Sequence, residues 1–265
     1  MQHRSITTIS TAIVVLAIAI QPFVRGQSTP VPPAVPGAVV WHDLLTEDGE
    51  SVLAFYEGLF GWETAEHRDG GWVVIHRGKL IAGISEIGDA AADLEEGMWL
   101  AGVAVRDVDA AAAKAVELGA KVDLGPKTLP GFARYAVITD LEEAPLLLVD
   151  PEIEIGGASG HGAFVWTELW SKNPVAAASF YNEVVGYEQD RVKVNSNPYV
   201  VFETDDTRRA GLVATPLETI RPAWVPYIGV DELATTMARV TKLGGRVIVG
   251  PHDDFANGSV ALIGD

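Results

Sequence analysis

Two tryptophan–carboxylate pairs are the residues of this chain best suited to hold a small molecule. Trp41 stands two positions before Asp43, and Trp166 stands two positions before Glu168, with Trp170 two positions further on. Residues two apart in a β-strand lie on one face, and an unpaired carboxylate is costly to bury in a core. Each pair is therefore expected in a cleft wall, where aromatic rings and a carboxylate suit a flat or cationic molecule.

A second interpretation of these pairs stays open. In it, Asp43 and Glu168 lie in water at strand ends, and the tryptophans belong to the core. Trp99 and Trp224 begin later predicted strands, where they would either gate the cleft or cover it. Neither a Gly-x-Ser-x-Gly motif nor a Gly-rich phosphate loop occurs in the sequence, so it indicates no nucleophile and no nucleotide site.

The composition argues against a nucleic-acid partner and limits which residue types could bind a metal. The 265 residues include 36 acidic and 19 basic side chains, and the formal net charge is −17. A surface this acidic repels phosphate backbones, so we expect no nucleic-acid partner. The chain has no cysteine, which excludes disulfides and thiolate ligands. Any metal would need His, Asp or Glu.

The N-terminal segment has the features of an export signal. Residues 1–27 combine a short basic start with an unbroken apolar run over 12–20, which is short for a membrane-spanning helix. Residues 28–37 are Pro-rich and predict an extended spacer. We therefore expect a periplasmic or extracellular protein, with an uncleaved N-terminal membrane anchor as the alternative.

The chain repeats itself at a shift of 125 residues. Matched pairs include Trp41 with Trp166, Tyr56 with Tyr181, Gly61 with Gly186, Trp99 with Trp224, and Asp140 with Asp265. Gly83 and Gly211 match at a shift of 128, so one turn is longer in the second copy. The repeat predicts two domains, residues 38–150 and 161–265, joined by a Gly-rich linker over 151–160.

Each copy alternates a strand, a helix and further strands, twice over. The pattern predicts an α+β fold of four βαβββ modules arranged as two tandem pairs. The second copy stops at the position matching Asp140, so it lacks a counterpart of the strand predicted over 145–149. We expect that the chain is a fragment of a longer protein; the alternative is an open sheet edge in the second copy.

The sequences of the two copies resemble those of the vicinal oxygen chelate superfamily, the glyoxalase, bleomycin-resistance and dioxygenase group. The resemblance rests on WHDLLTEDGESVLAFYEGLFGWE in copy one, WTELWSKNPVAAASFYNEVVGYE in copy two, and VAVRDVDAAAAKAVELGAKV before a Gly-Pro turn. It covers nearly all of residues 38–265. It implies the glyoxalase/bleomycin-resistance-like fold, in which paired modules form one small-molecule cleft per copy.

The resemblance also implies where a metal would bind. In the metal-using members, four cleft positions supply His, Gln or Glu, and here the matching residues are Trp41, Leu100 and Leu147 in copy one and Trp166 and Val225 in copy two. None of these side chains can ligate a metal, so we expect no metal cofactor. A one-residue slip in register would instead make His42 a ligand, with His76 or Glu86 nearby.

These observations lead to three hypotheses. The first is an exported, metal-independent protein that binds a small molecule, similar to the drug-sequestering branch of the superfamily. The second is a metal-dependent lyase, isomerase or dioxygenase that uses copy one. The third is a scaffold or dimerisation module with filled clefts. The sequence assigns no reaction, and a homodimer stays open.

Overall fold

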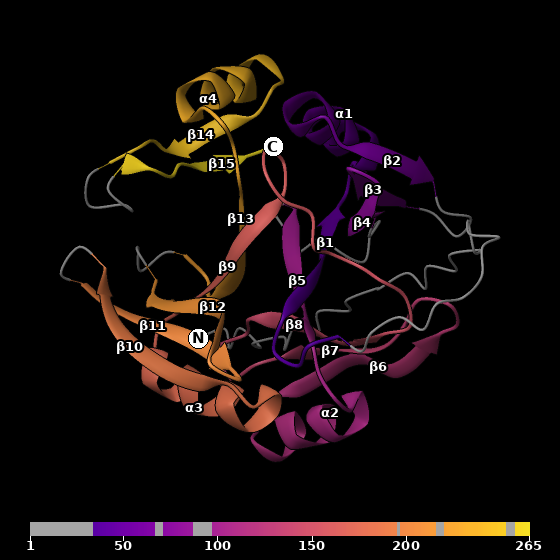
Figure 1. Cartoon of the computed structure of the whole chain (residues 1–265), viewed down its shortest axis with the longest axis vertical. Helices are drawn as coiled ribbons and strands as arrows, with labels where there is room; N and C mark the ends of the chain where they lie inside the picture. Colours follow the sequence, from indigo (N-terminus) through magenta and orange to yellow (C-terminus); the bar gives the residue numbers. More distant parts are fainter. Residues whose placement is uncertain (1–33, 67–70, 87–96, 195–196, 216–219, 253–257) are drawn as a thin grey trace, which may run out of the picture.

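The computed structural model describes residues 34–66, 71–86, 97–194, 197–215, 220–252 and 258–265. Copy one contains two modules that each open with a strand and a helix (Figure 1). The first consists of β1 (Val39–Thr46), α1 (Gly49–Phe60), β2 (Glu63–Glu66), β3 (Trp72–His76) and β4 (Lys79–Glu86). The second consists of β5 (Met98–Ala104), α2 (Val108–Glu117), β6 (Lys121–Leu129), β7 (Ala133–Thr139) and β8 (Pro145–Pro151).

Copy two repeats this order with fewer strands. Its first module consists of β9 (Phe164–Ser171), α3 (Pro174–Val185), β10 (Glu188–Val194), β11 (Asn197–Thr204) and β12 (Thr207–Ala214). Its second consists of β13 (Ala223–Ile228), α4 (Leu233–Lys242), β14 (Arg246–Val249) and β15 (Leu262–Gly264). The α+β architecture of paired modules predicted from the repeat is confirmed.

The sequence explains why the first helix of each copy forms where it does. The Asp48 side chain accepts a hydrogen bond from the backbone of Ser51, and Gly61 ends α1 at a φ of 68°. Asn173 caps α3 in the same way, and Gly186 ends it at a φ of 86°. Both features are the usual side-chain cap and left-handed glycine stop of an α-helix. Strand β2 was not predicted, because its side chains are mostly exposed and lack apolar alternation.

The two copies form separate sheets. Copy one forms an eight-stranded sheet in the order β2-β3-β4-β1-β5-β8-β7-β6, with β1 and β5 antiparallel at its centre. Copy two forms a five-stranded sheet, β10-β11-β12-β9-β13, while β14 and β15 pair only with each other. Among the described residues, no strand lies between β13 and β15, where copy one has β8 between β5 and β7.

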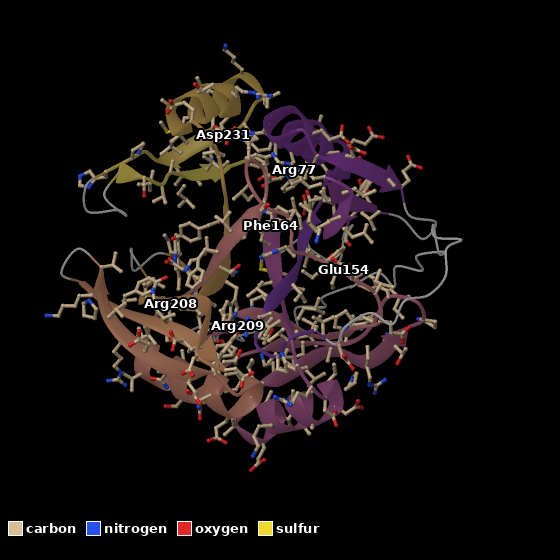
Figure 2. All side chains as sticks on the ribbon, viewed as in Figure 1. Arg77, Glu154, Phe164, Arg208, Arg209 and Asp231 are labelled. Carbon is tan, nitrogen blue, oxygen red and sulfur yellow. The ribbon has the colours of Figure 1, made fainter. Side chains whose placement is uncertain are left out.

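The copies pack head to tail around an approximate two-fold relation. Figure 1 shows α1 beside α4 at one end and α2 beside α3 at the other, with β1, β5, β9 and β13 between them. At the centre, His42 Nε2 lies 3.1 Å from Thr167 Oγ1. The His42 ring also stacks on Phe164 with centroids 3.9 Å apart, and Figure 2 labels Phe164 near the middle of the molecule.

His42 and Thr167 occupy matching positions of the repeat, 125 residues apart, and they bond directly to each other. Burial lowers the pKa of His42 to about 3, so the ring is neutral when it hydrogen-bonds to Thr167.

Within the described residues, no helix is both long and apolar enough to cross a membrane. The predicted signal, residues 1–27, lies outside the described residues.

The central hydrogen bond leads to a first prediction. Thr167→Val keeps the shape of the side chain but leaves His42 without its buried partner, which we expect to lower the free energy of unfolding by about 1–3 kcal/mol. Urea denaturation followed by circular dichroism measures this change. Thr128→Val removes an exposed hydroxyl that accepts from Arg134 and should change stability by less than about 0.5 kcal/mol. Equal effects of the two substitutions would contradict the structural role of the pair.

Candidate functional site

Each central strand divides its side chains between two faces. On β1, Leu44 packs against α1, whereas Trp41 lies on the opposite face with Leu100 and Leu147. We call this opposite face the inner face of copy one. The inner face of copy two is the matching face of its sheet, which carries Trp166, Glu168 and Trp170. In the structure, each tryptophan–carboxylate pair shares one strand face, away from the helices.

The inner face of copy one is covered by apolar side chains. Trp41 is 1% exposed, and its ring meets Phe132 edge-on with centroids 5.1 Å apart. Leu129, Tyr135 and Leu147 belong to the same buried cluster. The side chains at the three expected metal-ligand positions of copy one are therefore buried and apolar: Trp41, Leu100 and Leu147.

Asp43 is the exception in this apolar cluster. It is 7% exposed, and its Oδ1 has no hydrogen-bond partner in the described structure. Burial raises the pKa of Asp43 to about 6, while a hydrogen bond from Trp41 opposes that shift. The carboxylate lies directly over Gly83, where a Cβ atom would come within 2.2 Å of Oδ1. Asp43 is thus an incompletely satisfied acceptor.

In copy two the corresponding carboxylate is fully engaged. Tyr199 Oη donates to Glu168 Oε1 at 2.7 Å, and Tyr227 Oη donates to Oε2 at 2.6 Å. Trp166 Nε1 in turn donates to Tyr199 Oη at 2.8 Å, and Trp170 Nε1 lies 3.4 Å from Oε2. Trp166, Glu168, Tyr199 and Tyr227 are all partly exposed. This network presents a carboxylate among aromatic rings at an accessible surface.

The electrostatics of this network keep the tyrosines protonated. Burial, the Glu168 charge and the hydrogen bond to it all raise the pKa of Tyr199, and the same causes raise the pKa of Tyr227. Arg208, labelled over the strands of copy two in Figure 2, lies 3.7 Å from Asp190 and 3.6 Å from Glu203. The two carboxylates therefore offset the charge of Arg208. Arg208 forms no direct ion pair with Glu168.

Sequence reasoning missed Tyr199 and Tyr227. Tyr227 stands opposite Trp166 in the β13–β9 register, and its match in copy one is Gly102, which stands opposite Trp41. Tyr199 precedes Val201 by two positions, and Val201 pairs with Gly211. The equivalent pair in copy one is Val73 with Gly83, which makes Gly71 the counterpart of Tyr199. Both tyrosines could have been found by threading the two copies in strand register.

Trp99 and Trp224 do not line the inner faces, which corrects their prediction as cleft residues. Trp99 pairs with Leu44 on the helix side, and its Nε1 donates to Tyr56 Oη at 3.2 Å. Trp224 is buried and donates to Tyr181 Oη at 3.1 Å. The antiparallel register puts Leu100 and Val225, the next residues along, opposite Asp43 and Glu168.

The residues of the alternative metal site are not brought together. His42 faces copy two, where it contacts Thr167. Glu86 accepts a hydrogen bond from the backbone N–H of Gly49 at 2.9 Å. His76 lies near the connection between the copies, where a Cβ on Gly162 would be 3.2 Å from its ring. Among the described residues, no group of three or more potential ligands could hold a metal ion.

The unpaired carboxylate of Asp43 leads to a second prediction. Its pKa is raised from 3.8 to about 6 on folding, so the native state binds a proton more tightly than the unfolded state. The contribution of Asp43 to the free energy of unfolding is therefore most favourable below about pH 4. It falls by roughly 3 kcal/mol as the pH rises through about 6. Asp43→Asn does not carry this penalty, so its stability relative to the unsubstituted protein should increase from pH 4 to pH 8.

Urea unfolding of both proteins at several pH values measures this difference, and Asp109→Asn on the exposed face of α2 is the control. Other carboxylates titrate in both proteins and cancel in the difference. A difference that stays constant from pH 4 to pH 8 would contradict the buried, unpaired state of Asp43.

Comparisons with known proteins agree with this architecture. Residues 38–144 match the family described as the Glyoxalase/Bleomycin resistance protein/Dioxygenase superfamily. Two mycobacterial proteins, from Mycobacterium tuberculosis and Mycobacterium bovis, both named "Putative glyoxylase CFP32", are 32% identical over 122 residues. The match covers 43% of this chain and 44% of each relative, so it spans less than half of their length.

Solved structures extend the likeness in fold over most of the chain. The Mn(II)-bound glyoxalase from Novosphingobium aromaticivorans is 16% identical with a TM-score of 0.56, covering 82% of this chain and 74% of its own. The 2,2',3-trihydroxybiphenyl 1,2-dioxygenase from Sphingomonas wittichii strain RW1 is 14% identical with a TM-score of 0.56, covering 86% and 90%. At such identities the likeness concerns the fold alone. Residues 38–144 therefore match this family in sequence, and most of the chain shares the fold of these two enzymes.

Proposed function

We propose that this chain is a small-molecule-binding protein whose copy-two inner face takes a flat or cationic organic molecule without a metal ion. The observation that carries the proposal is the Glu168 carboxylate, held by Tyr199 and Tyr227 and partly exposed beside Trp166. A cation placed there gains both charge attraction and contact with aromatic faces. Export through residues 1–27 is part of the proposal and rests on the sequence.

The hydrogen bonds of Glu168 indicate which cations suit this face. Both carboxylate oxygens already accept from tyrosine hydroxyls, so a ligand need not donate a hydrogen bond. A quaternary ammonium or a delocalised aromatic cation, which has charge but few or no donors, fits such a site. The tyrosines also fix the carboxylate in place before binding, which reduces the entropy lost on association.

The residues do not fit the metal chemistry that the superfamily implies. Trp41, Leu100 and Leu147 occupy the expected ligand positions of copy one, and Trp166 and Val225 occupy those of copy two. A divalent cation needs oxygen, nitrogen or sulfur donors, and these side chains offer none in a ligating geometry. The names of the structural neighbours support the rival, a metal-dependent enzyme in copy one, only through the shared fold.

The binding proposal predicts a measurable dependence on one carboxylate. Titration of the protein with benzyltrimethylammonium should change tryptophan fluorescence in a saturable way, because Trp166 and Trp170 adjoin Glu168. Glu168→Gln keeps the size of the side chain but removes its charge, and we expect at least about a fivefold weaker affinity, equivalent to about 1 kcal/mol. Glu117→Gln on the surface of α2 is the matched control and should leave the affinity unchanged.

Two results of this titration would count against the proposal. An affinity that Glu168→Gln leaves unchanged would place binding elsewhere. The lack of any saturable signal would favour the third hypothesis, a scaffold with filled clefts.

Metal analysis separates the binding protein from the rival enzyme. After incubation with MnCl₂ or FeSO₄ and removal of free ions by desalting, we expect well below one metal ion per chain by inductively coupled plasma mass spectrometry. The expected ligand positions carry no metal-binding atoms, so they cannot retain a divalent cation. One retained ion per chain that is lost in His42→Ala would establish the metal site of the rival hypothesis instead.

A further inference from the structure

A cavity of about 40 Å³, partly open to solvent, lies where the two copies meet the connection between them. Residues from all three parts of the chain line it, among them Val39, His42 and Ile81 of copy one, Gly156 and Ala158 of the connection, and Phe164 of copy two. The tryptophan–carboxylate pairs do not belong to this lining. The cavity is therefore separate from both inner faces.

His42 supplies the polar group of this cavity. It is 3% exposed, and its ring stacks on Phe164. Its Nε2 lies 3.1 Å from Thr167 Oγ1, which is the hydrogen-bond partner of the ring in the described part of the chain. The other ring nitrogen, Nδ1, has no partner there. The remaining side chains of the lining are apolar, so a ligand meets one polar side-chain atom in apolar surroundings.

The bond to Thr167 determines which groups can pair with Nδ1. If Nε2 of the neutral ring donates to Thr167, Nδ1 is an acceptor; if the Thr167 hydroxyl donates, Nδ1 is a donor. A hydroxyl group pairs with Nδ1 in either state, because it both donates and accepts. An ammonium or a carboxylate fits only one state and brings a charge that is costly to bury without a partner. Lys79, beside the connection, is already paired with Glu154 at 3.0 Å.

The size of the cavity limits the ligand to a short chain. One water molecule needs about 10–15 Å³, whereas a cavity that holds benzene measures about 150 Å³. The 40 Å³ available here therefore admits about three water-sized groups and no aromatic ring. Water itself is a poor occupant, because a buried water makes about two to four hydrogen bonds and the side chains of the lining offer one.

The wall formed by the connection is in place without a ligand. Gly156 N donates to Leu80 O at 2.7 Å, and Arg77, labelled in Figure 2, donates through Nη1 to Ser159 O at 2.9 Å. A Cβ atom on Gly156 would lie 2.6 Å from Val40 O, so glycine lets the connection lie this close to β1. The cavity is thus formed before a ligand binds, which reduces the entropy lost on association.

We propose that the cavity between the copies binds a small uncharged alcohol, whose hydroxyl group hydrogen-bonds to His42 Nδ1 and whose short carbon chain contacts Ile81 and Phe164. A molecule held there contacts copy one, the connection and copy two together, so its binding stabilises their junction. The site takes a neutral molecule, unlike the cationic ligand proposed for copy two, and does not depend on that ligand.

Titration with propan-1-ol, followed by NMR of the isoleucine methyl groups, tests this proposal. The Ile81 signals should shift in a saturable way, with half-saturation in the millimolar range, because so small a molecule supplies little binding energy. Propylammonium and propionate, charged molecules of similar size, should bind at least about tenfold more weakly. Benzyl alcohol should also bind at least about tenfold more weakly, because its ring is larger than the cavity.

Substitutions locate the binding. Ala158→Leu fills the cavity from a partly exposed position of the connection and should weaken propan-1-ol binding at least about tenfold. Ala113→Leu, at an exposed position of α2, adds the same atoms elsewhere and should leave the affinity unchanged. His42→Phe combined with Thr167→Val keeps a ring beside Phe164 but removes Nδ1, and should weaken binding at least about fivefold.

Hydrogen exchange gives a readout of the junction itself. Exchange at the Gly156 amide should slow when propan-1-ol binds, because the bond to Leu80 lies in the cavity wall. Ile81 shifts that rise with propan-1-ol without saturating, or an affinity that Ala158→Leu leaves unchanged, would overturn the proposal. Equally tight binding of propylammonium or propionate would also overturn it. The benzyltrimethylammonium titration tests copy two separately, so either proposal can fail while the other stands.

Discussion

The two hydrogen bonds that Tyr199 and Tyr227 donate to Glu168 determine how the repeated fold differs between its copies. They hold a charged carboxylate at a partly exposed face at 2.7 Å and 2.6 Å, and no basic side chain in the described part of the chain bonds to it. Copy one has glycine at both tyrosine positions, and its Asp43 is buried with one oxygen unpaired. The same backbone thus carries an open, satisfied acceptor in one copy and a closed, unsatisfied one in the other.

The packing between copies explains how one fold can support both arrangements. Contacts across the approximate two-fold relation tie the helix side of each copy to the other: Tyr181 donates to Asp140 at 2.9 Å, and the charge of Asp265 adds to burial in raising the pKa of Tyr56. His42 and Thr167 join the centre. These contacts use the helix side and the strand side facing the other copy, so the residues of the inner faces can differ between the copies without disturbing them.

The sequence predicted the elements and the two acids but not their partners. Alternation along β1 and β9 placed Asp43 with Trp41 and Glu168 with Trp166 correctly, because that pattern is local. The sequence left open whether Trp99 and Trp224 gate the cleft or cover it, since the face of β5 and β13 depends on an antiparallel register that a single strand does not reveal. Tyr199 and Tyr227 were missed because they reach Glu168 from strands that are distant in sequence.

A crystal structure grown with both MnCl₂ and benzyltrimethylammonium tests the central claim most directly, because both ligands compete under identical conditions. The account predicts the organic cation beside Glu168, within contact of Trp166 and the two tyrosines, and no anomalous manganese signal on either inner face. Manganese coordinated by protein nitrogen or oxygen atoms on an inner face, with the organic cation absent, would contradict it.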